Sequence, residues 1–186
     1  MITLLLSVAF AAGIHAGIPV VGVPGVTEPA WQTPDLGWTA SVEGGWIKVF
    51  VGRTEAEAQG WYDRALEGLT LVTSPASGLG DVCHGDGEQL FLFRDGNVAV
   101  MVRSAANARG VATKLHSAIV DGPAWPTAPA LQRGTDGRWR VAVPEGGGVR
   151  SVGGRPAPYQ PGVYLEPPTE LVVWDRYGRP AVVRGP

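Results

Sequence analysis

Ten consecutive residues, Gly80 to Gln89, hold the densest group of chemically versatile side chains in the sequence, and they read GDVCHGDGEQ. They include the only cysteine of the 186-residue chain, one of its three histidines and three carboxylates. Thiolate, imidazole and carboxylate groups all bind zinc, and a thiol beside an imidazole is the pairing used by cysteine nucleophiles. These residue types raise two hypotheses, a metal site and a thiol enzyme, both centred on Cys83, His84 and Asp86.

The spacing of these residues argues against a metal. In an extended segment His84, Asp86 and Glu88 share one face, but a zinc site normally needs three or four converging protein ligands. Gly85 and Gly87 favour a turn instead. The D-x-[DN]-x-[DN]-G pattern of a calcium loop is also absent. We therefore expect no metal and no cofactor.

Nucleophilic catalysis at Cys83 has little support either. Adjacent residues of a strand point to opposite sides, so Cys83 and His84 would not form a pair, and the nearest alternative base is His116, beside the apolar stripe of a predicted helix. The chain contains neither G-x-S-x-G nor H-E-x-x-H. We expect a protein without catalytic activity. The alternative is a secreted hydrolase or thiol/metal enzyme that uses Cys83, His84 and Asp86.

The N-terminus resembles an export signal. The apolar run from Ile2 to Ile14 has the length of a signal-peptide core, and Ala16 supplies a small residue at a cleavage point. No Lys or Arg follows Met1 in this run, and the uncharged stretch from Ile2 to Val23 leaves an uncleaved anchor or a buried core segment as the alternatives. We predict that residues 1–16 are a signal peptide (or anchor) and that the protein is periplasmic or extracellular.

The composition restricts the partners. A net charge of −2 and a pI near 5.9 argue against a nucleic-acid-binding protein, which would carry a basic stripe. A single cysteine cannot form an internal disulfide. We expect a protein or cell-envelope component as partner and membrane contact only through an uncleaved N-terminal segment. The oligomeric state stays open.

Three segments follow the predicted signal: a Pro/Gly-rich leader (17–43), an α+β core (44–143) and a β-rich extension (144–186). Within the core, alternation predicts a strand near residues 45–51. Thr54 and Glu57 have the spacing of a helix-capping box, and an apolar stripe continues to Leu69.

A hairpin and a second helix follow. Asp95-Gly96 between two apolar runs predicts a tight turn with apolar residues on both faces and with Glu88 opposite Arg103. A helix is predicted from about 105 to 120, capped by Ser104 and ended by Asp121-Gly122-Pro123, and a strand at 138–143 completes a β-α-β-β-α-β order. This order predicts a ferredoxin-like fold, in which helices cover one sheet face. The C-terminal extension is then expected to pack on the core and cover the other face, and Pro180 places its last strand at a sheet edge.

Seven tryptophans are the remaining unusual feature. Trp46, Trp61 and Trp174 fit strand or helix patterns, whereas Trp139 and three others lie in or beside Pro/Gly-rich segments. Exposed aromatic rings bind partners at interfaces, so Trp31, Trp38 and Trp125 are the predicted binding residues. The alternative is that they close the edges of the core. The function predicted from the sequence is an exported, non-catalytic binding domain.

Overall fold

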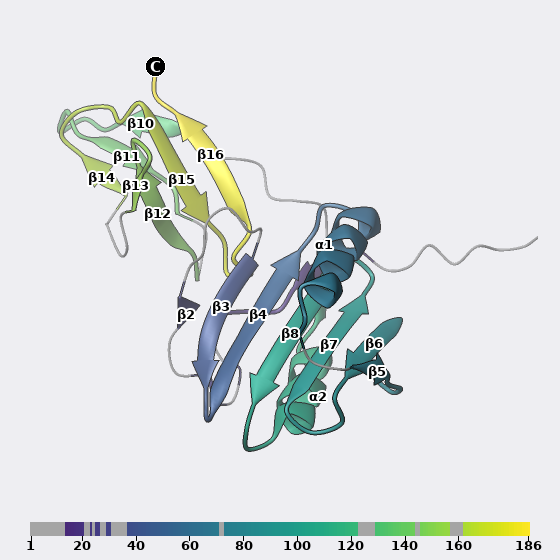
Figure 1. Ribbon diagram of the computed structural model, residues 1–186. Helices are drawn as coiled ribbons and strands as arrows, with labels where there is room; N and C mark the ends of the chain where they lie inside the picture. Colours follow the sequence, from purple (N-terminus) through teal and green to yellow (C-terminus); the bar gives the residue numbers. More distant parts are fainter. Residues whose placement is uncertain are drawn as a thin grey trace, which may run out of the picture.

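The computed structural model describes residues 14–20, 23, 25–26, 29–30, 37–70, 73–122, 129–143, 146–156 and 162–186. The predicted signal peptide therefore lies almost wholly outside the described residues. Two lobes are visible in Figure 1, a larger α+β lobe and a smaller all-β lobe that contains the C-terminus. Among the helices of the described ranges, none is long and apolar enough to cross a membrane.

A seven-stranded antiparallel sheet forms the centre of the first lobe. Its strand order is β2-β3-β4-β8-β7-β6-β5. The strands are β2 (Pro29–Ala30), β3 (Gly37–Val42), β4 (Gly45–Val51), β5 (Ser74–Pro75), β6 (Val82–Gly85), β7 (Leu90–Asp95) and β8 (Val98–Ser104). Residues 37–42, which the sequence placed in a leader, thus form a full strand of this sheet.

Helix α1 (Glu55–Glu67) begins as the sequence predicts. The Thr54 hydroxyl accepts a hydrogen bond from Glu57 N at 3.2 Å, and Glu57 reaches back to Arg53 N at 2.7 Å. These bonds satisfy backbone donors that have no partner inside the first helical turn. The buried side of α1, with Ala58 and Tyr62, packs on Leu92 and Met101, so this helix covers one face of the central hairpin.

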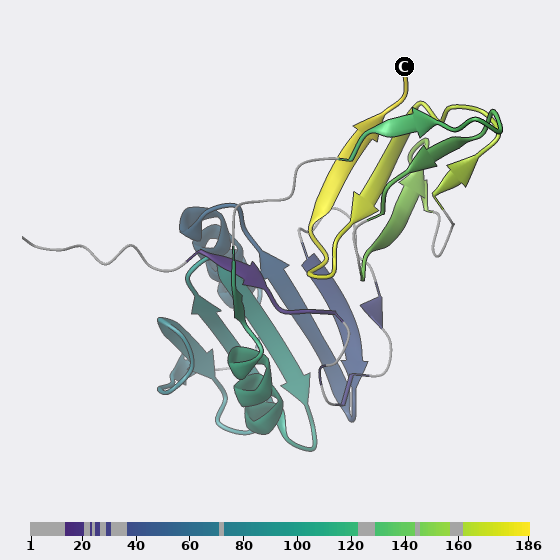
Figure 2. The ribbon, with the colours of Figure 1, turned by 180° about the vertical axis from the view of Figure 1, so that it is seen from behind.

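The other face is covered by α2 (Ala108–Ser117) together with residues 14–20, here called the N-terminal strap. Ala112 and Leu115 of α2 pack against Phe91 and Phe93, and Ile18 of the strap joins the same core. Figure 2 shows α2 and the strap on the side of the sheet opposite α1. Strand β1 (His15–Gly17) of the strap pairs with β9 (Val120–Asp121), which follows α2.

The mixed α+β class is confirmed, but the ferredoxin-like arrangement is not. The order β4-β8-β7 with α1 as the crossover does match its first three strands. However, the two helices lie on opposite faces, and β11 (Trp139–Val141), the expected fourth strand, belongs to a separate sheet. Because both faces of the hairpin are apolar, the helix stripes alone could not specify which face α2 covers.

The hairpin register also differs from the prediction. Asp95 pairs with Val98, so the turn residues are Gly96 and Asn97, and Leu90 rather than Glu88 lies opposite Arg103. The shift moves each partner by two positions. Side chains alternate with a period of two, so the assignment of residues to faces is unchanged.

The second lobe contains residues 129–186 and has its own small core. One sheet has the order β10-β11-β14 and the other β13-β12-β15-β16. Besides β11, the strands are β10 (Leu131–Arg133), β12 (Gly148–Val152), β13 (Arg155–Pro156), β14 (Val163–Tyr164), β15 (Glu170–Trp174) and β16 (Pro180–Arg184). Residues from both sheets, among them Val141, Leu171 and Val183, form the core. The lobe boundary therefore falls before Pro129 rather than at residue 143.

The turn between β15 and β16 connects the lobes. Val20 N of the strap donates to Arg176 O at 2.8 Å. Asp175 and Arg179 form a buried ion pair of 2.7 Å within this turn, and Asp175 Oδ1 also accepts from Tyr177 N and Arg179 N. The second lobe thus meets the strap rather than a bare face of the central sheet.

Candidate functional site

Cys83 and His84, the residues with the most reactive side chains, point to opposite faces of β6. Cys83 lies opposite Phe93 in the ladder, is 5% exposed and belongs to the core under α2. Burial raises the pKa of the Cys83 thiol, although Arg109 nearby acts to lower it. A buried thiol with a raised pKa is a poor nucleophile, because the thiolate is the reactive form.

His84 is engaged on the α1 side of the sheet. The Tyr62 hydroxyl lies 2.5 Å from His84 Nδ1. Burial, followed by the nearby Cys83 and Asp63, raises the pKa of Tyr62 to about 12. The phenol therefore stays neutral at physiological pH and is available as a donor to the imidazole. This contact accounts for His84 as part of the packing between α1 and β6.

Asp86 organises the loop into β7. Its Oδ1 accepts hydrogen bonds from the backbone N–H groups of Glu88, Gln89 and Leu90, at 2.8 to 2.9 Å. Burial acts to raise the pKa of Asp86, but these backbone donors outweigh it and hold the pKa below its usual value. The turn predicted for this loop is present. Among the described residues, no three or more His, Cys, Asp and Glu side chains are placed to hold a metal ion.

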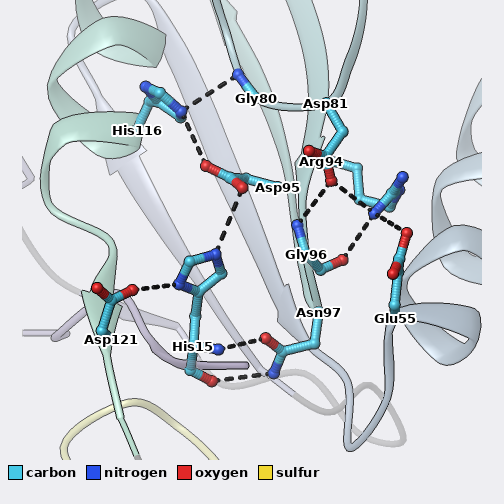
Figure 3. Close-up of polar contacts among 10 residues, drawn as sticks. All are labelled: His15, Glu55, Gly80, Asp81, Arg94, Asp95, Gly96, Asn97, His116 and Asp121. Atoms are coloured by element: carbon cyan, nitrogen blue, oxygen red, sulfur yellow. Dashed lines mark hydrogen bonds and ion pairs between the residues drawn. The ribbon is translucent and has the colours of Figure 1, made fainter. Parts of the chain in front are cut away.

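A different polar cluster lies at the turn of the β7–β8 hairpin, shown in Figure 3. The Asp95 carboxylate lies between two imidazoles, with Oδ1 3.3 Å from His15 Nε2 and Oδ2 2.9 Å from His116 Nε2. His15 Nδ1 in turn lies 2.8 Å from Asp121 Oδ1. Four residues from β1, β7, α2 and β9 are thus joined; His116 and Asp121 are five residues apart, whereas His15 and Asp95 are each distant in the sequence from the other three.

The backbone around this cluster is held as well. The Asn97 side chain accepts from His15 N at 2.7 Å and donates to His15 O and Gly52 O at 2.9 and 2.8 Å. Gly80 N points to His116 Nε2 at 3.2 Å. Gly80 has φ +59°, and a Cβ there would lie 2.3 Å from Arg94 O, so only glycine fits.

Arg94 forms a second group on the α1 side of the same turn. Its Nη1 contacts Asp81 Oδ2 at 2.9 Å, Glu55 Oε1 at 3.0 Å and Gly96 O at 2.9 Å (Figure 3). Arg94 is buried, so two carboxylates compensate a charge that would otherwise be costly. The group ties the start of α1 and the loop before β6 to the hairpin.

The contacts of the Asp95 cluster and of the Arg94 group are those of structural links between elements rather than of a catalytic site. Both ring nitrogens of His15 face carboxylates, which leaves neither for a substrate. Within the described part of the chain, no hydroxyl or thiol is hydrogen-bonded to His15 or His116. A general base needs a reacting group within hydrogen-bond reach. The network instead connects the strap, α2 and the hairpin turn.

The predicted binding tryptophans do not form a platform in the structure. Trp38 is 2% exposed, and its indole N–H donates to Ile18 O at 3.0 Å, so it closes the core under the strap. Trp31 and Trp125 lie outside the described residues. Trp46 and Trp61, assigned to the core, are half-buried beside α1, where Trp61 stacks on Phe50.

The second lobe carries a groove that sequence reasoning did not find. It has a volume of about 380 Å³ and lies between the end of β16 and the segment leading into β10. Trp139 and Leu131 line one side and Val182 and Arg184 the other. Val182 is 48% exposed and so offers apolar surface to a ligand in the groove. The available signals were Trp139 in a loop-rich segment and Pro180, which predicted an edge strand.

Comparisons of the chain with models of known families, with curated proteins and with solved structures found no match.

Proposed function

We propose that the protein is an exported, non-catalytic domain that binds a protein partner through the groove of its second lobe. The observation that carries this proposal is the groove itself, which places Trp139 and Leu131 beside the exposed Val182 and Arg184. Aromatic, aliphatic and arginine side chains are the types enriched at protein interfaces.

The state of the reactive groups supports the absence of catalysis. The Cys83 thiol is buried with a raised pKa, and His84 is occupied by Tyr62. Asp86 is used by three backbone donors in its own loop. The three side chains named for a thiol or metal enzyme thus serve three separate contacts.

Export rests on the sequence, and the packing of the strap refines where cleavage would occur. Ala16 is 2% exposed, and His15 is bonded through both its backbone and its ring. Cleavage after Ala16 would remove both residues from β1. We therefore place the mature N-terminus before His15, which mass spectrometry of the protein secreted by a bacterial host would check.

Peptide selection tests the binding function. Random dodecapeptides displayed on phage are selected on the full-length chain, and the recovered peptides are synthesised and titrated. We expect binding to weaken about tenfold in Val182→Asp, because a buried carboxylate would replace an apolar contact. Val163→Asp is the matched control, since Val163 is 39% exposed in the same lobe but does not line the groove.

Equal binding to both variants would place the interaction elsewhere and overturn the role of the groove. Nuclear magnetic resonance of the full-length chain shows which backbone amide signals a selected peptide perturbs. If none of the recovered peptides perturbs the signals of residues 129–131 and 182–185, the role of the groove is likewise overturned.

A further inference from the structure

The outer edge of β16 at Val182 and Arg184 gives the groove a backbone component. In the part of the chain that the structure describes, β16 is the last strand of its sheet and pairs with β15. In the ladder Gly185 N donates to Thr169 O at one end, and Asp175 N donates to Arg179 O at the other. Residues 179, 181, 183 and 185 therefore direct their backbone groups toward β15, since the pattern alternates in an antiparallel pair.

Val182 and Arg184 consequently direct their backbone N–H and C=O groups away from β15. Both residues line the groove. Pro180 is two residues before Val182 and has the same orientation, so its lack of an N–H removes no hydrogen bond to β15. An outward edge beside an apolar groove is the arrangement to which an extended peptide adds as a further strand.

Charge distinguishes the kinds of peptide that fit. Residues 129–186 contain eight arginines and five Asp or Glu residues, a net charge of +3, whereas the preceding 128 residues carry seven basic and twelve acidic residues, a net charge of −5. Arg184 and Arg133 are both exposed, and they lie on β16 and β10, the two strands that border the groove. Glu170 lies opposite Arg184 in the β15–β16 ladder, but the net charge of residues 129–186, which counts it, is still +3 and favours an acidic segment.

We propose that the partner binds as an extended, acidic peptide segment that pairs with the outward edge of β16. This inference rests on the proposed function and specifies its ligand. Cross-strand neighbours on one face are two residues apart, so the segment presents an apolar side chain beside Val182 and a carboxylate beside Arg184. The segment thus has the pattern Asp/Glu-x-apolar or its reverse, and its apolar residue enters the groove beside Trp139.

Three synthetic heptapeptides test the charge. The acidic probe is the acetylated, amidated peptide Ser-Thr-Glu-Thr-Val-Thr-Ser; the second has Lys in place of Glu, and the third has Gln. We expect the Glu peptide to bind the full-length chain about three- to fivefold more tightly than the Lys peptide, as expected for an exposed ion pair. Arg184→Glu should reverse the order of the Glu and Lys peptides.

Removal of one backbone donor tests the strand pairing. Val182→Pro deletes an outward N–H and leaves the inward ladder to β15 intact, so the lobe should still fold, and binding of the Glu peptide should fall about fivefold or more. Val182→Ala is the control that trims the side chain and keeps the N–H. N-methylation of alternate residues of the peptide should abolish binding in one parity and not in the other.

Each result bears on one proposal. Equal affinities for the Glu and Lys peptides, absence of Glu-peptide binding up to millimolar concentration, or equal effects of Val182→Pro and Val182→Ala would overturn the inference. Phage-selected peptides that bind the groove without a carboxylate would overturn it too, while the proposed function would stand. Failure of the phage selection to reach the groove removes the proposed function itself.

Discussion

The two lobes differ in how the faces and edges of their sheets are covered. The central sheet of the first lobe is covered on both faces, by α1 on one side and by α2 with the strap on the other. Among the described residues, the α1 face contains seven buried core residues and the other face nineteen. The described part of the second lobe has five buried core residues between its two sheets, and β16 is the edge strand of its sheet there. Open sheet edges are sites of strand addition. The first lobe therefore holds most of the buried core, and the second presents the sheet edge at which we propose that a partner binds.

Disrupting the larger core should produce the largest effect. Phe93→Ala removes a fully buried ring between α2 and the sheet and should cost about 4 kcal/mol in the free energy of unfolding. Hydrogen exchange of the full-length chain measures this cost separately for each lobe. We expect faster exchange in β7 and β8 and little change in β15 and β16.

Equal acceleration in both lobes would show that they unfold as one unit and would break the comparison. The exposed Leu165→Ala is the control, because Leu165 is 80% exposed and its removal should leave exchange in both lobes unchanged.

The buried ion pair in the β15–β16 turn should be next in size. Asp175→Ala leaves the Arg179 guanidinium buried without this partner carboxylate and removes the acceptor of two backbone N–H groups. We expect the free energy of unfolding of the second lobe to fall by about 3 kcal/mol, which would be measured as faster hydrogen exchange in β15 and β16. Asp136→Ala breaks an exposed pair with Arg140 and should have little effect. Similar losses in the two variants would contradict this account.

Local sequence signals predicted local structure well. The Thr54 cap located α1, the alternation in residues 90–102 assigned both hairpin faces, and Pro180 marked the edge strand. Each of these depends on neighbours in the chain. The face chosen by α2 does not, because Phe91 and Leu92 offer equally apolar surfaces on opposite sides.

The network of His15, Asp95, His116 and Asp121 was not predicted because it also depends on residues that are distant in the sequence. Local patterns placed Asp95 in a turn and Asp121 at the end of a helix, and neither pattern indicates a further partner. Only the folded chain brings His15 and His116 to either side of Asp95. The groove likewise combines Trp139 with Val182, which are far apart in the sequence. Convergence of distant residues is information that one sequence does not contain.

Release of the N-terminal strap should be a smaller effect confined to the first lobe. Asn97→Ala removes three hydrogen bonds, to His15 N, His15 O and Gly52 O, and should cost about 2 kcal/mol. Limited proteolysis should then cut within residues 14–20 faster than in the wild type. The cap of α2 is Asn107, which accepts from Gly110 N, and not Ser104 as predicted. Asn107→Ala removes this exposed cap and should leave the strap protected. Cleavage at the same rate in both variants would show that Asn97 does not hold the strap.

The contact between Tyr62 and His84 should have the smallest effect and a distinct pH dependence. Tyr62→Phe keeps the ring and removes the hydroxyl that lies beside His84 Nδ1, at a cost of about 1 kcal/mol near neutral pH. The folded-state pKa of about 12 exceeds the ordinary value of 10.0, so the fold favours the neutral phenol. This contribution is complete below pH 10.0 and is lost as the pH rises through about 12.

The wild type should therefore lose more stability than Tyr62→Phe between about pH 10 and pH 12, as measured by urea unfolding at each pH. An identical loss in both proteins would mean that Tyr62 ionises as readily in the folded chain as in the unfolded one. A larger loss in the wild type would show that Tyr62 is buried as a neutral phenol where α1 packs on the sheet.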